Sequence, residues 1–341
     1  MDKALLSKTA AAMVAKGKGV LAADESAGTC EKRFSSVGVE CTEENRRTYR
    51  NLLFSAQGVE QYLSGVILFD ETLRQSTKDG TNFGAYLQKN GIIPGIKVDA
   101  GAQDMPLHPG EKVTEGLDKL PGRMKEYFGM GARFAKWRAV ITIGEGIPSD
   151  ACIEANAHAL ARYSAACQEA SIVPIVEPEV LLDGTHSAER SEAVHEATLE
   201  ALFTELARQD VSLEHVILKA SMCVSGKENA RQAPVAEVAE RTLRVLKRTV
   251  PAALPGVVFL SGGQTDENAT AHLDAMNRLG APWPLTFSYS RALQAVALNA
   301  WRGQAGNVSA AQKAFHHRAR MNSLAARGEW KKEMEKEALA A

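Results

Sequence analysis

The stretch His215-Val-Ile-Leu-Lys-Ala-Ser221 contains the pattern on which the fold assignment depends. Val216 to Leu218 form a β-type apolar run, and Lys219 stands at its end. Alternate side chains of a strand share a face, so Lys219 lies on the same face as Ile217. If Ile217 points into a barrel, Lys219 does too. A lysine is almost never fully buried without a task or a partner, but a single lysine at a strand end is more often exposed. The other strands must decide between these two interpretations.

Seven further β-type runs recur along the chain with helical segments between them. Several are continuous apolar stretches, as is typical of parallel strands covered by helices. Eight alternating strand–helix units predict an α/β fold with right-handed crossovers, and they close most naturally into a (β/α)8 TIM barrel. A doubly wound open sheet is the alternative, but no Gly-x-Gly-x-x-Gly turn follows the first strand. The eight runs are Gly19–Ala23, Gly65–Phe69, Ile93–Val98, Ala132–Trp137, Val173–Glu177, Val216–Leu218, Val257–Leu260 and Leu285–Ser288.

The helical segments have recognisable ends. Thr42 and Thr265 precede acidic first turns, Ser149 opens an alanine-rich segment, and Pro251 stops another helix. A barrel typically needs about 250 residues and accepts insertions. We therefore expect residues 1–341 to form a single barrel domain with an N-terminal helix and a short charged C-terminal tail. The tail, residues 329–341, is expected to be a solvated end.

Composition argues against several classes of protein. The formal net charge of −1 gives no general attraction to nucleic acid or to a membrane surface. No apolar run approaches the length of a membrane span, and the N-terminus lacks the apolar core and cleavage site of a signal peptide. We expect a cytoplasmic protein whose partners are neither nucleic acid nor membrane. The cysteines, odd in number and without a Cys-x-x-Cys pair, indicate free thiols in a reducing compartment; they are Cys30, Cys41, Cys152, Cys167 and Cys223.

Charged residues gather at the C-terminal ends of the strands, where barrel enzymes build their sites. An inward Lys219 near Lys136 would experience desolvation and a like charge. Both lower the pKa of a lysine, which leaves a neutral amine able to attack a carbonyl. Glu177 and Glu179 can then shuttle protons for carbinolamine formation and dehydration, while Asp24 is available for a different proton.

Two groups of residues at the strand ends are suited to anions. Gly262 and Gly263 let the backbone approach a ligand, and the helix after Arg291 offers a positive N-terminus. A second basic group lies on other strand ends and comprises Lys32, Arg33, Lys97 and Arg138, with the hydroxyls of Ser26 and Thr29. Two cationic sites around one reactive lysine predict a substrate with an anion at each end.

Each motif alone has a simpler explanation. Ser261-Gly262-Gly263 can be only a turn, and Lys136 and Arg138 can form ion pairs with Glu177 and Glu179 at the barrel mouth. The joint placement of all these groups at one end of successive strands favours an enzyme. No two-histidine helical zinc motif occurs, and no histidine stands at a strand end, so we expect neither a catalytic metal nor a cofactor.

These residues resemble the class I, Schiff-base fructose-bisphosphate aldolases, in the family's order from about residue 19 to about residue 325. The resemblance implies a single (β/α)8 barrel, usually assembled as a homotetramer. It implies reversible cleavage of fructose 1,6-bisphosphate, a small phosphosugar, into dihydroxyacetone phosphate and glyceraldehyde 3-phosphate. The matching stretches are Gly19-Val-Leu-Ala-Ala-Asp-Glu-Ser26, Thr42-Glu-Glu-Asn-Arg-Arg47, Gly95-Ile-Lys-Val-Asp99, Lys136-Trp-Arg138, Val176-Glu-Pro-Glu179, Leu218-Lys219, Phe259-Leu-Ser-Gly-Gly-Gln264, Leu285-Thr-Phe-Ser-Tyr289 and Arg291-Ala-Leu-Gln294.

The resemblance also implies roles for single residues. Lys219 matches the lysine that forms the iminium, Glu177 the proton shuttle, and Asp24 the group that takes the hydroxyl proton as the carbon–carbon bond breaks. Glu179 and Lys136 match groups that tune the Glu177 site. The residues that match the binding site of one phosphate are Ser261, Gly262, Gly263, Ser288, Ser290 and Arg291, and those around the other are Ser26, Thr29, Arg33, Lys97 and Arg138.

The chain departs from the family pattern in four places. Ser290 replaces the usual glycine, where only the backbone N–H is expected to matter, and Thr29 replaces a serine. Residues Ala220-Ser-Met-Cys223 follow Lys219 where animal members have Pro-Asn. The chain ends without the terminal tyrosine that assists enamine protonation in many members. We therefore expect that removal of about ten C-terminal residues changes turnover little.

Three other functions remain open at this point. A Schiff-base barrel could act on another phosphosugar, such as sedoheptulose 1,7-bisphosphate or fructose 1-phosphate, or as a transaldolase-like enzyme. The chain could also be a non-catalytic barrel that serves as a scaffold, although all the matched catalytic groups are present. A metal-dependent aldolase is disfavoured by the lack of histidine ligands.

Overall fold

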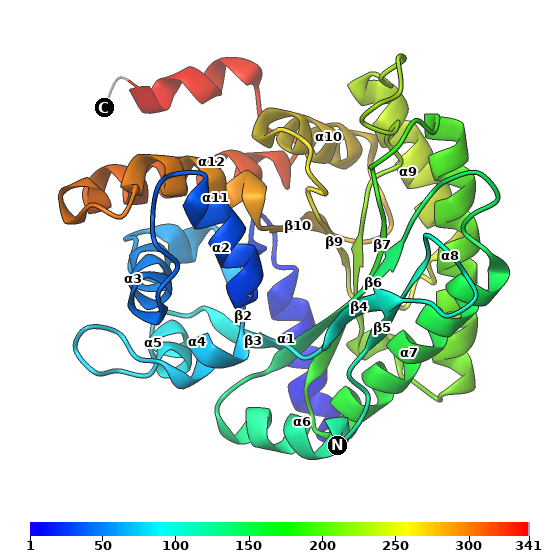
Figure 1. The fold of residues 1–341 in the computed structure, drawn as a ribbon, viewed down its shortest axis with the longest axis horizontal. Helices are drawn as coiled ribbons and strands as arrows, with labels where there is room; N and C mark the ends of the chain where they lie inside the picture. The colour runs from blue at the N-terminus through cyan, green and yellow to red at the C-terminus, as the bar shows by residue number, and fades with distance from the viewer. Residues whose placement is uncertain (340–341) are drawn as a thin grey trace.

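The predicted strands close into one parallel barrel in the computed structural model, which describes residues 1–339 (Figure 1). Around the barrel their order is β1-β10-β9-β8-β7-β6-β3-β2, and every neighbouring pair is parallel. The expected (β/α)8 fold is therefore confirmed. The barrel strands are β1 (Gly19–Ala23), β2 (Leu63–Leu68), β3 (Ile93–Lys97), β6 (Phe134–Ile141), β7 (Val173–Val180), β8 (Ile217–Ala220), β9 (Val257–Phe259) and β10 (Leu285–Tyr289).

Helices surround the barrel (Figure 1). The predicted N-caps form, because the side chains of Thr42, Ser149 and Thr265 accept hydrogen bonds from the first turns of their helices. No helix within residues 1–339 is both long and apolar enough to cross a membrane. The helices are α1 (Lys3–Met13), α2 (Ala27–Ser35), α3 (Glu43–Phe54), α4 (Asp70–Arg74), α5 (Phe83–Lys89), α6 (Leu120–Gly129), α7 (Asp150–Glu169), α8 (Ala188–Arg208), α9 (Val235–Thr249), α10 (Asp266–Leu279), α11 (Arg291–Trp301) and α12 (Val308–Ala325), with 3-10 turns η1 (Val59–Gln61), η2 (Leu213–His215), η3 (Ala305–Asn307) and η4 (Lys332–Leu339).

The two faces of the strands bury different sets of apolar side chains. Ile175 and Ile217 belong to a cluster inside the barrel, which α1 joins through Leu6 and Met13. Leu218 faces outward and joins the larger core beneath the surrounding helices. Full burial of one such side chain stabilises the fold by about 1.5–3 kcal/mol, so a register slip that exchanged the faces would be costly. Alternation therefore directs the residue two positions after Ile217 into the barrel.

Strands β6 and β7 run further than the sequence predicted. They stay paired through Arg138 with Glu177 and through Val140 with Glu179. Arg138 and Glu179, which lie just beyond the predicted bounds, thus belong to these strands, because they neutralise each other in an ion pair and need not leave the sheet. A hairpin between β3 and β6, formed by β4 (Gly101–Asp104) and β5 (Lys112–Glu115), was not predicted because its sequence is polar and contains no apolar run.

The expectation of a solvated tail is wrong for its first part. Trp330 is only 9% exposed, and its ring N–H donates to Oε1 of Glu335 over 3.0 Å. Oε2 of Glu335 accepts from Nη1 of Arg318, a buried residue of α12, over 2.5 Å. The charge pattern of the tail predicted solvation because it gave no sign of a partner on another helix.

Candidate active site

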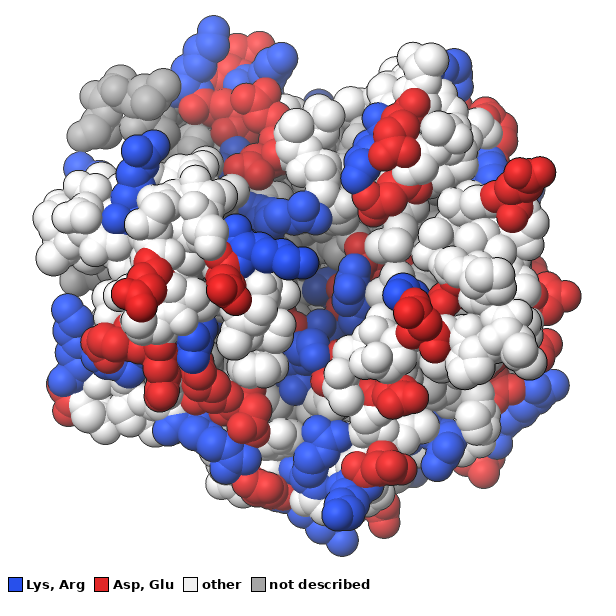
Figure 2. Space-filling model, in the orientation of Figure 1, with Lys and Arg blue, Asp and Glu red and all other residues white. Residues whose placement is uncertain are grey.

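A cavity of about 650 Å³ opens at the C-terminal end of the barrel. Lys and Arg side chains gather in the hollow at the centre of this face (Figure 2). The lining carries seven Lys or Arg and five Asp or Glu residues, an excess of two positive charges in a chain whose net charge is −1. Such a local excess suits an anionic ligand. Fifteen of the sixteen predicted site residues line this cavity, and the other, Gly263, lies beside it.

Lys219 points into the barrel at the floor of the cavity. It is 3% exposed, and its neighbour Ile217 on the same face is fully buried. Nζ of Lys219 lies 3.0 Å from Oε1 of Glu177, a residue of β7 that is itself 4% exposed. A buried amine in contact with a buried carboxylate can exchange a proton with it without solvent.

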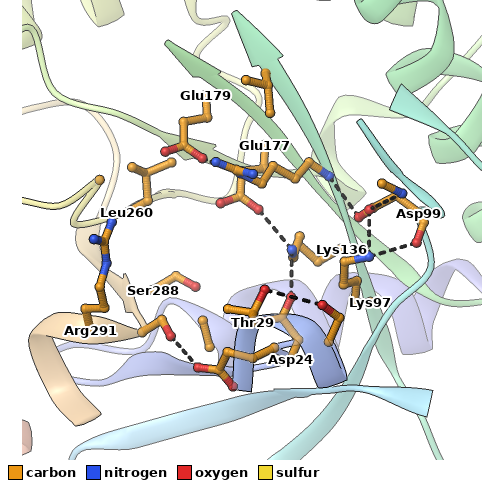
Figure 3. A pocket seen from close by; sticks show the side chains of 18 of the residues that line it. Asp24, Thr29, Lys97, Asp99, Lys136, Glu177, Glu179, Leu260, Ser288 and Arg291 are labelled. Carbon is orange, nitrogen blue, oxygen red and sulfur yellow. Dashed lines mark hydrogen bonds and ion pairs between the residues drawn. The ribbon is translucent and has the colours of Figure 1, made fainter. Parts of the chain in front are cut away.

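Lys136 connects Glu177 to a second carboxylate (Figure 3). Its Nζ lies 3.3 Å from Oε2 of Glu177 and 2.7 Å from Oδ2 of Asp24. Burial alone would lower the pKa of Lys136, but Asp24, Glu177 and Asp99 outweigh burial and raise that pKa above its ordinary value. Lys136 is therefore a fixed cation of the site.

The same pairing keeps Asp24 ionised. Burial would raise the pKa of its carboxyl group, but Lys136 and Lys219 more than compensate, and the pKa falls from 3.8 to about 2. At neutral pH Asp24 is thus a carboxylate that can only accept a proton. The site contains two carboxylates that share one lysine, so they can serve different protons.

Two of the expected phosphate-binding cations are held by carboxylates. Arg138 forms an ion pair with Glu179, and Nζ of Lys97 lies 2.7 Å from Oδ1 of Asp99. The ion pairs foreseen as the simpler explanation therefore exist. The Arg138 side chain is nevertheless 41% exposed, so part of its guanidinium remains accessible from the cavity. The pairs orient these cations and leave their outer surface open.

Arg33 lies in a different place from the one expected. It belongs to α2, as do Thr29 and Lys32, so these residues lie on a helix and not at a strand end. Nη1 of Arg33 donates to Oγ of Ser290 over 2.9 Å and forms an ion pair with Glu25. Arg33, predicted in one phosphate-binding group, thus contacts Ser290, which was predicted in the other.

Ser290 also acts through its side chain, contrary to the expectation that only its backbone would matter. Its hydroxyl donates to Oε1 of Glu25 over 2.6 Å. The same carboxylate is paired with buried Arg50, 2.6 Å away, and accepts from Nε2 of Gln294 over 2.9 Å. Glu25 therefore holds the side chains of Ser290, Arg50 and Gln294 together on this side of the cavity.

The segments after β9 and β10, where an anion site was predicted, place two glycines, Arg291 and the start of α11 close together. Gly262 and Gly263 have φ angles of 58° and 93°, which favour glycine. The guanidinium of exposed Arg291 lies over Gly263, since a Cβ atom added there would come within 3.1 Å of Nη2. Helix α11 begins at Arg291, so its free N–H groups add to the positive field. Oγ of Ser288 is buried without a hydrogen-bond partner among residues 1–339.

Sequence reasoning missed several residues that support the site. Glu25, Asp99 and Gln294 stood inside the recognised motifs, but nothing local showed that Glu25 and Asp99 pair with cations or that Gln294 donates to Glu25. Arg50 lies on α3 and gave no signal, because a helix position does not reveal what the helix covers. In the described part of the chain, no group of three or more His, Cys, Asp or Glu residues is placed to hold a metal ion.

Known proteins are similar to this chain over nearly its whole length. A "Probable fructose-bisphosphate aldolase class 1" of Xanthomonas campestris pv. campestris is 61% identical over 328 residues, which cover 96% of this chain and 98% of the relative. "Fructose-bisphosphate aldolase 5, cytosolic" of Arabidopsis thaliana is 51% identical over 95% of this chain and 91% of its own length.

A solved structure is similar in fold as well. Plasmodium falciparum fructose-bisphosphate aldolase, crystallised with TRAP and a small-molecule inhibitor, superposes with a TM-score of 0.95 at 48% identity. The match covers 96% of this chain and 95% of that one. The family model described as fructose-bisphosphate aldolase class-I matches residues 5–341. The chain belongs to the class I fructose-bisphosphate aldolase family.

Proposed function

We propose that this protein cleaves fructose 1,6-bisphosphate reversibly into dihydroxyacetone phosphate and glyceraldehyde 3-phosphate through a Schiff base on Lys219. The observation that carries the proposal is the 3.0 Å contact between buried Lys219 and buried Glu177 in a cavity with cations at both ends. The relatives match nearly the whole chain, and they are named as fructose-bisphosphate aldolases, which supports the same reaction.

In the first stage, Lys219 and Glu177 form the imine. Glu177 first takes a proton from the Lys219 ammonium, and the neutral amine that results attacks the ketone carbon of the sugar. A proton then moves from the nitrogen to the former ketone oxygen and gives a carbinolamine. Glu177 then delivers a proton to the departing hydroxyl, which leaves as water, and an iminium ion remains. The contact from Glu177 to the lysine nitrogen makes it the nearest carboxylate for both proton transfers.

In the second stage, the carbon–carbon bond breaks. Asp24, ionised at neutral pH, accepts the proton of the sugar C4 hydroxyl as the electrons of the C3–C4 bond move into the iminium. Glyceraldehyde 3-phosphate leaves and an enamine remains. Protonation of the enamine and hydrolysis of the regenerated iminium release dihydroxyacetone phosphate and free Lys219. Lys136 stays protonated throughout and stabilises the Asp24 carboxylate, 2.7 Å away.

The two ends of the cavity suit the two phosphates. Near one end, Arg291, the glycine pair and the start of α11 offer a cation and free N–H groups. Toward the other, Lys97 and Arg138 present charges oriented by Asp99 and Glu179. We assign one phosphate to each end. Comparison of cleavage rates for fructose 1,6-bisphosphate, fructose 1-phosphate and sedoheptulose 1,7-bisphosphate tests this assignment against the other phosphosugars.

We also propose a homotetramer in the cytoplasm. Support comes from the family resemblance and from Arabidopsis relatives that are named cytosolic. Light scattering coupled to size-exclusion chromatography measures the assembly directly. A mass equal to that of the 36.7 kDa chain would contradict the tetramer.

The experiment that tests the main proposal is borohydride reduction in the presence of dihydroxyacetone phosphate, followed by peptide mass mapping. We expect the reduced adduct on Lys219. An adduct on Lys136 or Lys97 would keep the reaction class but overturn the assigned roles. Absence of an adduct on folded, phosphate-free protein would overturn the Schiff-base function.

A further inference from the structure

The hydrogen-bonded ladder between β7 and β8 ends where the proposed chemistry begins. The two strands pair at Ile175 with Ile217 and at Val176 with Leu218, and no further pair follows. Each strand nevertheless continues along its other neighbour. Strand β7 stays paired with β6 as far as Val180, and β8 stays paired with β9 as far as Ala220. Beyond Val176 and Leu218, the strand ends that carry Glu177 and Lys219 are therefore no longer paired residue by residue.

A chain of hydrogen bonds, called the relay below, joins the two strand ends through Val180, Ser221, His195 and Ser191. The backbone N–H of Val180 donates to Oγ of Ser221 over 3.1 Å, and the Ser221 hydroxyl lies 2.8 Å from Nε2 of His195 on α8. Nδ1 of His195 lies 2.7 Å from the carbonyl oxygen of Ser191. A carbonyl oxygen only accepts, so Nδ1 carries the proton and Nε2 accepts from Ser221. Every donor in the relay then has one acceptor.

The relay is buried and is absent from the mechanism described above. Ser221 is 6% exposed and His195 is 4% exposed, and neither lines the cavity. Burial lowers the pKa of His195 to about 4, so the ring is neutral at the pH of the reaction and keeps its acceptor. These residues therefore cannot act on the substrate directly. They can act only through the strand ends that they join.

We infer that Ser221 and His195 are positioning residues, which hold the end of β7 against the end of β8 and thereby set the contact between Glu177 and Lys219. The inference rests on the proposed Schiff-base function. Ser221 lies two residues after Lys219, and Val180 lies three residues after Glu177, so a shift of either strand end moves one partner of that contact. Removal of the hydroxyl leaves the Val180 N–H buried without an acceptor, and the strand ends then separate.

The expected kinetic signature is specific to one step. A misplacement of about 1 Å can slow a positioned reaction by about 100-fold. Imine formation uses the Glu177–Lys219 contact, so it should slow by at least about tenfold when the relay is broken. The glycine pair and Arg291 follow β9 and β10 and are not part of β7 or β8. KM for the bisphosphate should therefore change by less than about threefold, a smaller effect than the loss of one hydrogen bond.

The test compares five variants by the rate of imine formation, measured by borohydride quenching of single-turnover mixtures with dihydroxyacetone phosphate. Ser221→Ala and His195→Phe remove the relay. Ser221→Thr and His195→Gln retain a hydroxyl and an acceptor and should keep the wild-type rate within about threefold. Ser225→Ala is the matched control, because Ser225 is also buried in the segment after β8 and its hydroxyl likewise accepts a backbone N–H, from Ala233 over 3.1 Å.

The outcomes separate this inference from the proposed function. If wild-type protein forms no adduct, the proposed function itself fails. If wild type reacts and Ser221→Ala or His195→Phe reacts at the same rate, the inference is overturned. It is also overturned if Ser225→Ala slows imine formation as much as Ser221→Ala does, since the effect would then be merely structural. If Ser221→Ala does not fold, His195→Phe is compared with His195→Gln instead. Equal rates of imine formation in these two variants would overturn the inference.

Discussion

Glu177 and Lys219 meet inside the barrel because Glu177 lies two residues after Ile175, Lys219 lies two residues after Ile217, and those two isoleucines are directly paired. Ile175 of β7 pairs with Ile217 of β8, and alternation carries the next inward residue of each strand to the same height. The result is a 3.0 Å contact between a carboxylate and an amine, both buried. The register of the two strands thus brings a proton donor and a nucleophile together in one sheet.

The first prediction concerns Glu177. Glu177→Gln removes the group that can exchange a proton with the Lys219 nitrogen, so we expect imine formation to slow by about 10²–10⁴-fold. Borohydride trapping rates measure this step. The matched variant is Glu179→Gln, two residues further along the same face and paired with Arg138, which should slow the step much less. Equal rates for wild type and Glu177→Gln would refute the proton-shuttle role.

The second prediction separates cleavage from imine formation. Asp24→Asn leaves Lys219 and Glu177 in place but cannot accept the hydroxyl proton. We expect the imine with fructose 1,6-bisphosphate still to be trapped, while cleavage slows by at least about 10²-fold. Mass mapping then finds the intact six-carbon adduct on Lys219. Recovery of only the three-carbon adduct would show that another group takes the proton.

The third prediction concerns acid stability. The pKa of His195 is lowered from 6.5 to about 4 in the folded chain, because burial disfavours its charged form. Between these pH values the unfolded chain binds a proton that the folded chain does not, so stability falls as pH decreases from 6.5 toward 4. For His195 alone the loss is about 3 kcal/mol. His195→Gln should flatten this part of the curve in chemical unfolding measured at several pH values; an unchanged slope would contradict the assignment.

The fourth prediction concerns Ser290. Ser290→Gly removes the hydroxyl that binds both Glu25 and Arg33, so Arg33 loses part of its orientation. We expect KM for the bisphosphate to rise about threefold to tenfold, with kcat less affected. Ser290→Ala is the control, since it removes the hydroxyl without the added backbone freedom of glycine. A rise of KM in Ser290→Gly alone would assign the effect to the backbone.

The fifth prediction concerns the tail. Burial would raise the pKa of Glu335, but its bonds with His317 and Arg318 lower it to about 2, so the carboxylate is charged at neutral pH. Truncation after Lys331 removes this partner of buried Arg318 and should cost about 1–3 kcal/mol of unfolding free energy. Truncation after Lys336 keeps Glu335 and should cost little.

Turnover provides the second measurement on these truncations. We expect turnover per folded molecule to change little in both, because residues 329–336 contact α12 and do not line the cavity. Glu335→Gln separates the charge from the chain length. A large loss of turnover in the folded protein truncated after Lys331 would contradict a purely stabilising role for Glu335.

Local pattern was enough to predict the barrel and to collect most of the site. Apolar runs and helix caps are short-range signals, and eight alternating units leave few ways to bury both faces of a sheet. Parallel strands deliver their C-terminal ends to one edge, so residues as distant in sequence as Asp24 and Arg291 could be placed in one cavity without knowledge of a single contact.

What the sequence by itself determined is which side chains face inward, because alternation along a strand depends only on neighbouring residues. Only the tertiary structure decided which partners they meet. Examples are the contacts of Glu25 with Ser290, of His195 with Ser221, and of Arg318 with Glu335, each of which joins two different elements of the fold. Such contacts depend on how each helix is rotated and tilted on the barrel. That orientation results from the packing of the whole core, which no local periodicity records.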